Sequence, residues 1–99
     1  MKFHLTTKAK KELIEIAKYT EKNWGVKQRN IYLEQLDKTF HVIAQNPKKG
    51  KNCDYIRAGY HKISAGRHII FYRQFSAKEI QIVSILHDAM DVDTHLQIH

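Results

Sequence analysis

The feature that most restricts the fold is a change in hydrophobic spacing halfway along the chain. Before Pro47 the apolar residues recur three and four positions apart, as on one face of an α-helix, whereas after Gly59 they alternate in short runs, as in β-strands. Helices grouped in one half of a sequence and strands in the other are typical of an α+β domain. The 99 residues therefore predict a single domain, 1–99, in which helices cover one face of a mainly antiparallel sheet.

The first half predicts two helices joined by a tight turn. The first helix is expected over residues 8–24. Its apolar stripe consists of Ala9, Leu13, Ile16, Ala17 and Trp24. Gly25 ends this helix, because glycine readily adopts the left-handed conformation that follows many helices. The second helix is expected over 27–45, where Pro47 stops it. So short a connection favours an antiparallel helical hairpin.

Strands account for the rest of the predicted fold, and they are expected at residues 2–5, 60–64, 67–75 and 80–87. Residues 48–52 are polar and basic, and they are expected to form a loop. Thr6 or Thr7 offers a hydroxyl that can cap the first helix, and Asp88 can cap a short C-terminal helix. The predicted order is strand, helix, helix, three strands and a terminal helix.

The chain is strongly basic, since 17 Lys and Arg residues against 10 Asp and Glu give a net charge of +7 and an isoelectric point near 9.6. Such an excess attracts polyanions or an acidic partner. The single cysteine, Cys53, excludes an intramolecular disulfide and suits a reducing compartment. No apolar run approaches the roughly 18 residues that span a bilayer. We therefore expect a cytoplasmic protein without a membrane partner.

Metal binding has little support in the sequence. Asp91, His95 and His99 are spaced four apart, which would place them on one face of a helix. However, the last residues of a chain usually fray, and the sequence contains no CxxC or HExxH motif. No metal site and no cofactor are therefore expected.

Ribonuclease chemistry is an alternative that the second half leaves open. It needs a general acid, a general base and cations that stabilise the charge of the transition state. Six residues of the second half offer such groups: Arg57, Arg67, Arg73, His61, His68 and His87. Strand alternation separates His68 from the arginines at 67 and 73, and His61 and His87 converge only if the strand register allows it. The simpler interpretation is a half-exposed basic surface, which could also bind nucleic acid without cleaving it.

The predicted hairpin carries more large side chains than one inward face accommodates. Tyr19, Ile31 and Tyr32 do not all fit the apolar stripe that faces the sheet. A surface groove that accepts an amphipathic helix from an acidic partner is consistent with this excess. These three residues are the predicted contacts of such a partner.

Several segments, taken in order, resemble one family over nearly the whole chain. They are residues 17–25 (AKYTEKNWG), 45–50 (QNPKKG), 56–60 (IRAGY), 66–73 (GRHIIFYR), 82–91 (IVSILHDAMD) and 94–96 (THL). No single segment is specific, but the ordered set resembles the ParE branch of the ParE/RelE toxin superfamily. The fold that this resemblance implies is the one predicted above from hydrophobic spacing.

The resemblance implies the toxin of a type II toxin–antitoxin system. Such a toxin is not an enzyme but inhibits DNA gyrase, acting on the gyrase polypeptide that cleaves DNA, so that it meets DNA only through the gyrase complex and arrests growth. A ParD-like acidic antitoxin would neutralise it by wrapping an extended segment and a helix around it. The residues that the resemblance and the surface charge assign to target inhibition are Arg57, Arg67, Arg73, His87, Asp88, Met90 and Asp91.

Two other functions stay open at this point. RelE-type relatives are ribosome-dependent mRNA endonucleases, and His61 stands where those enzymes often have arginine. The ending ILHDAMD at residues 85–91 resembles the ParE side instead. A non-toxic remnant that still binds an antitoxin is the third function, because His61 and Ser84 replace arginines that are frequent in the family.

Overall fold

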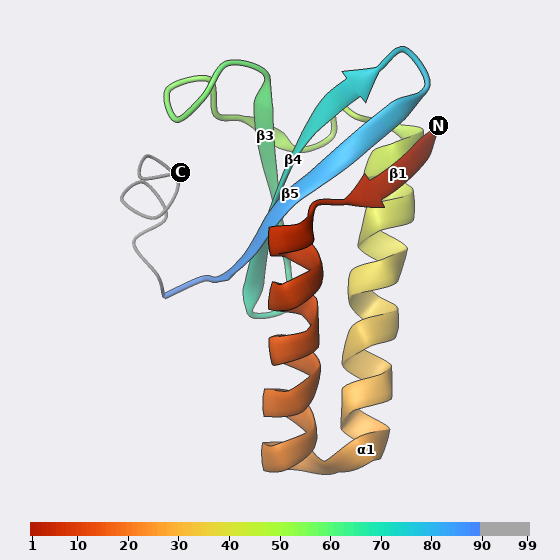
Figure 1. Ribbon diagram of the computed structural model, residues 1–99, viewed down its shortest axis with the longest axis vertical. Helices are drawn as coiled ribbons and strands as arrows, with labels where there is room; N and C mark the ends of the chain where they lie inside the picture. The colour runs from red at the N-terminus through yellow and green to blue at the C-terminus, as the bar shows by residue number, and fades with distance from the viewer. Residues whose placement is uncertain (90–99) are drawn as a thin grey trace.

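The computed structural model describes residues 1–89, which form one long, broken helix packed on a five-stranded sheet (Figure 1). In chain order the elements are β1 Lys2–Leu5, α1 Thr7–Gln45, β2 Lys51–Asn52, β3 Tyr60–Ala65, β4 His68–Ser76 and β5 Glu79–His87. This arrangement confirms the predicted α+β class. The short helix predicted after Asp88 lies outside the described residues.

The sheet has the order β1-β5-β4-β3-β2. Strands β3, β4 and β5 form the antiparallel meander that the alternating pattern predicts, whereas β1 lies parallel to β5 at one edge. The predicted loop at 48–52 is wrong in its last two residues, because Lys51 and Asn52 pair with Lys62 and His61 as the short edge strand β2. Two residues are too few to show alternation, so β3 determines this pairing rather than a local signal.

Helix α1 begins where the sequence predicts. The Thr6 hydroxyl accepts a hydrogen bond from the Ala9 N–H at 3.0 Å, which satisfies one of the free donors of the first turn. The helix ends at Gln45, and Asn46 follows as its C-cap immediately before Pro47. The cap residues therefore follow from the sequence at both ends.

The backbone of α1 leaves helical geometry at Gly25, where φ is +92°. Glycine tolerates this region without the steric cost that a Cβ adds. We call residues 7–24 the first arm and 26–45 the second arm. Figure 1 shows the arms running beside each other, and Arg29 of the second arm pairs with Glu21 of the first.

The sheet buries apolar side chains on both faces. The larger cluster joins α1 to the sheet and includes Leu36, Phe40, Ile43, Ile70, Tyr72, Ile80 and Ile82. The smaller cluster includes Cys53, Phe71 and Leu86, with Ile56 and Tyr60 packed against it. Because neighbours along β4 alternate between these clusters, β4 contributes to two cores. This dual burial explains the near-continuous apolar run in its sequence.

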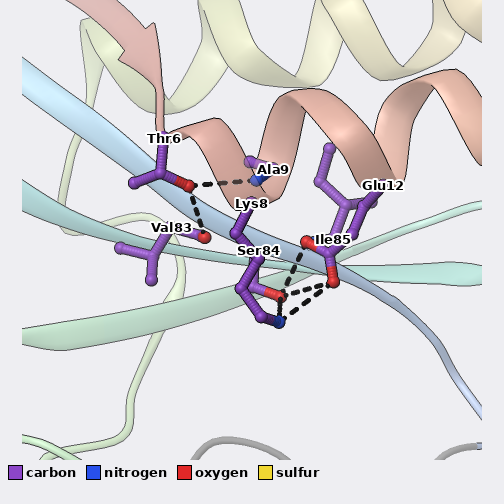
Figure 2. A network of polar contacts seen from close by, with 7 residues as sticks. All are labelled: Thr6, Lys8, Ala9, Glu12, Val83, Ser84 and Ile85. Atoms are coloured by element: carbon purple, nitrogen blue, oxygen red, sulfur yellow. Dashed lines mark hydrogen bonds and ion pairs between the residues drawn. The ribbon is translucent and has the colours of Figure 1, made fainter. Parts of the chain in front are cut away.

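A polar network fastens the start of α1 to β5 (Figure 2). The Glu12 carboxylate accepts hydrogen bonds from the Ser84 hydroxyl and from the Ile85 N–H, each at 2.9 Å. The Lys8 ammonium lies 3.1 Å from the same carboxylate, and the Thr6 hydroxyl donates to the Val83 carbonyl at 2.8 Å. The Ser84 side chain is fully buried, so these bonds replace the water it has lost. The network fixes the position of the first arm on the sheet.

No helix within residues 1–89 is both long enough and apolar enough to cross a membrane.

Candidate functional site

Two depressions lie at opposite ends of the sheet. We call the first the aromatic groove, which has a volume of about 570 Å³ and lies between the two arms of α1 and the ends of β4 and β5. It is lined by Glu15, Ile16, Tyr19, Thr20, Trp24, Gln28, Tyr32, Arg67, His68 and His87. We call the second the basic cleft, of about 690 Å³, which is lined by Pro47, Lys48, Gly50, Asn52, Ala58, Gly59, His61, Arg73 and Gln74.

The Tyr32 hydroxyl organises the floor of the aromatic groove. It accepts a hydrogen bond from the Arg67 N–H at 3.0 Å and lies 2.5 Å from Nδ1 of His68. Burial raises the pKa of Tyr32, so this hydroxyl stays protonated near neutral pH. Gly66 has a φ of +58°, and a Cβ there would lie 2.5 Å from the Tyr32 ring. The β3–β4 turn therefore needs glycine so that it can approach the second arm.

Two histidines meet at the end of the groove. His68 and His87 are directly opposite each other on β4 and β5, with ring centroids 5.5 Å apart at an interplanar angle of 86°. Burial and, to a smaller extent, the neighbouring charge of His87 lower the pKa of His68. Nδ1 of His87 lies 3.4 Å from an Asp88 carboxylate oxygen. The pair thus forms a titratable end wall beside the Tyr32 hydroxyl.

The wall formed by the helix arms is aromatic and uncovered. The side chains of Tyr19 and Trp24 are 61% and 63% exposed, and their rings pack edge to face with centroids 5.8 Å apart. The expectation that Trp24 belongs to the buried stripe is wrong, because Gly25 breaks the helix next to it and leaves the indole outside the core. Trp24 and Gln28 are groove residues that the sequence interpretation missed. A tryptophan beside a helix-breaking glycine was the available signal.

The predicted partner contacts are divided by the structure. Tyr19 and Tyr32 both line the aromatic groove, as the excess of large side chains predicted. Ile31 is 49% exposed beside Tyr32 but does not line the groove.

The residues assigned to target inhibition lie in three places. Arg67 and His87 line the aromatic groove, and the Asp88 N–H bonds to the Arg67 carbonyl at 2.9 Å. Arg73 lies in the basic cleft, and Arg57 is exposed in the loop before β3. Met90 and Asp91 lie outside the described residues.

The strand register keeps His61 and His87 apart. His61 is level with Tyr72 of β4, whereas His87 is level with His68. Four residues along a strand correspond to roughly 13 Å. This pair of histidines therefore does not form a joint acid–base site. Across residues 1–89 no group of three or more His, Cys, Asp or Glu side chains is arranged to hold a metal ion, and His95 and His99 fall outside that range.

The fold and the groove define a small, basic α+β domain with an open aromatic binding surface. A family model described as the ParE toxin of type II toxin-antitoxin system, parDE, matches residues 3–92. The chain therefore belongs to the ParE toxin family, which confirms the resemblance found in its sequence.

Named relatives agree with this assignment. Toxin ParE1 of Mycobacterium tuberculosis is 42% identical over 95 residues, which cover 96% of this chain and 97% of the relative. Toxin ParE1 of Caulobacter vibrioides is 35% identical over 94 residues, which cover 95% and 96%. Among solved structures, the chromosomal ParDE TA system from P. aeruginosa matches with a TM-score of 0.74 at 19% identity, over 88% of this chain and 95% of that one. At this identity the structural match supports the fold.

Proposed function

We propose that this toxin inhibits DNA gyrase, blocks replication without catalysing a reaction, and is neutralised by a ParD-like acidic antitoxin. Membership of the ParE family supports the toxin role. The observation that carries the antitoxin role is the aromatic groove, an uncovered apolar surface with cationic groups at one end. Inhibition of gyrase would require the protein to act in the cytoplasm.

The groove suits an amphipathic helix. Exposed Tyr19 and Trp24 supply large, stiff side chains of the kind that dominate binding energy at protein interfaces. Arg67 at the other end can pair with carboxylates of the bound segment. The net charge of +7 would speed association with an acidic partner. Ile31 extends the apolar surface next to the groove.

Neutralisation would follow from the positions of the cations. Arg67 and His87, two of the residues assigned to target inhibition, line the groove in which we place the antitoxin. Asp88 continues from β5 toward Met90 and Asp91, which the ParE resemblance also assigns to the target. A helix bound in the groove would cover Arg67 and His87 and compete with gyrase for this surface.

The test combines gyrase, negatively supercoiled plasmid and the purified toxin, with cleaved DNA trapped and resolved on a gel. We expect cleaved DNA to accumulate and the cognate antitoxin to prevent it. Arg67→Gln should reduce trapping at least tenfold, whereas Lys18→Gln, an equal change in charge on the first arm, should not. Unchanged gyrase activity at saturating toxin would refute the proposed target.

The same protein added to translating ribosomes tests the endonuclease alternative, for which mRNA cleavage would be the positive result. Induction of the chain in cells without its antitoxin tests the third function. Growth that continues at the normal rate would identify a non-toxic remnant. Loss of antitoxin binding in Tyr19→Ala would then still report on the groove.

A further inference from the structure

The basic cleft has no part in the groove-based inhibition and neutralisation proposed above. We propose that the cleft binds the phosphodiester backbone of a nucleic acid strand directly. This goes beyond the expectation that the toxin meets DNA only through gyrase, and it does not depend on gyrase being the target.

Cationic groups from three separate elements converge on the cleft. Lys48 comes from the turn after α1, His61 from β3 and Arg73 from β4. None of the residues that line the cleft is acidic. Phosphate oxygens are bound mainly by Lys and Arg side chains, polar side chains and backbone N–H groups. The cleft thus presents the groups that phosphodiesters need without a lining carboxylate to repel them.

The charges in the cleft are not neutralised by close partners. Among residues 1–89, no ion pair involves Lys48, His61 or Arg73. The Asp54 carboxylate acts on His61 only through longer-range charge, because it accepts a hydrogen bond from the Gly59 N–H at 2.8 Å. That hydrogen bond lowers the pKa of Asp54 and ties its carboxylate to the loop.

Arg73 is oriented without losing its binding capacity. Its Nε donates to the Gln81 side-chain oxygen at 2.8 Å, and its guanidinium carbon lies 5.4 Å from the centre of the Phe75 ring. Within the described part of the chain, its two terminal nitrogens donate no further hydrogen bond. They are the pair of donors with which arginine binds two phosphate oxygens at once.

The floor of the cleft is held in place before any ligand binds. The buried Tyr72 hydroxyl accepts from the Gly50 N–H at 2.9 Å and donates to the Pro47 carbonyl at 2.8 Å, so it fastens the 47–50 turn to β4. The His61 ring stacks on Tyr72 with centroids 5.6 Å apart. Little ordering remains for the ligand to impose on these residues, which favours binding.

The cleft is separate from the aromatic groove. Arg73 is level with Gln81, whereas His68 of the groove is level with His87. Five residues along β4 correspond to roughly 16 Å. A nucleic acid strand in the cleft and a protein helix in the groove would therefore bind at distinct ends of the sheet.

The test uses the isolated full chain without gyrase, so that its failure leaves the gyrase proposal standing. Binding of dye-labelled duplex DNA and of single-stranded RNA, each of roughly 20 nucleotides, is followed by anisotropy between about 50 and 200 mM salt. Lys48→Gln/Arg73→Gln is compared with Lys18→Gln/Lys22→Gln, which removes equal charge from the first arm.

We expect the cleft variant to flatten the plot of log K against log salt concentration by about two units, one for each lost phosphate contact, whereas the arm variant keeps the parent slope. Binding of DNA, of RNA or of both would support the proposal and identify the source of the phosphodiester. If Arg73→Gln prevents folding, Lys48→Gln alone, in an exposed turn, should still lower the slope by about one.

The proposal is overturned if the parent chain binds neither nucleic acid, or if both double variants lose affinity equally. It is also overturned if polyglutamate of matched charge displaces the nucleic acids as well as unlabelled DNA does, because the cleft would then respond to negative charge alone.

Discussion

The two ends of the sheet use the same device to different effect. At each end a tyrosine hydroxyl accepts a hydrogen bond from a backbone N–H of a turn: Tyr32 from Arg67 and Tyr72 from Gly50. At each end a glycine, Gly66 or Gly50, leaves no room for a Cβ beside that tyrosine. Tyr72 is fully buried within the sheet, whereas Tyr32 stands on the helix at the wall of an open groove. The cleft end is therefore fixed, and the groove end can adjust.

The glycines provide the largest expected difference between the ends. A Cβ at Gly50 would lie 2.7 Å from the Lys62 carbonyl and 2.4 Å from the Tyr72 hydroxyl, neither of which can easily withdraw. Gly50→Ala should lower the free energy of unfolding by about 3 kcal/mol or more. Gly66→Ala should cost about 2 kcal/mol, because the Tyr32 ring can swing into the groove and backbone strain remains.

Denaturant unfolding of both variants measures this difference, with Gly59→Ala as the control. Gly59 has a φ of +84° but open space around its Cβ position, so about 1 kcal/mol of strain is expected alone. Equal losses for Gly50→Ala and Gly66→Ala would show that the groove end is as rigid as the cleft end.

The tyrosine hydroxyls provide the second test. Tyr72→Phe leaves the buried Gly50 N–H without its acceptor and should cost about 2 kcal/mol of unfolding free energy. Tyr32→Phe should cost about 1 kcal/mol, since water in the open groove can replace the hydroxyl. Thermal unfolding at neutral pH gives both values. A larger loss for Tyr32→Phe would reverse the proposed order of rigidity.

The histidine pair provides the smallest expected effect and gives it a direction. The folded state lowers the pKa of His68, so the unfolded chain binds more protons as the pH falls below the ordinary histidine value of about 6.5. Stability from the neutral His68 is therefore present above that pH and is lost as the pH falls through this range. Unfolding curves between about pH 7.5 and 5 should show this loss.

His68→Gln should flatten the pH dependence, whereas His41→Gln, exposed on the second arm, should leave the His68 contribution in place. A parent chain whose stability rises toward acid pH would contradict the predicted sign. Binding of an acidic antitoxin at the groove should strengthen as the pH falls over the same range, since protonation of His68 and His87 adds positive charge to its end wall.

The sequence predicted elements better than levels along them. Helical spacing and strand alternation predicted the helical residues and the β3–β5 meander, because many residues repeat each signal. Alternation indicates the face of a strand but not which residue lies opposite, so it grouped Arg67 with Arg73 although pairing separates them. The groove tyrosines Tyr19 and Tyr32 were predicted by size. The cleft depends on a turn returning to the sheet, which no local pattern shows.

The network around Glu12 has a consequence for synthesis. Its hydrogen-bond partners, Ser84 and Ile85, follow it by 72 and 73 residues, and β1 pairs with β5 across a similar distance. A chain growing from the ribosome has its first strand and first arm exposed long before their partners exist. Contacts so distant in sequence form late and slow folding. The toxin would therefore gain its groove only after nearly the whole chain has been translated, which gives the antitoxin time to be present first.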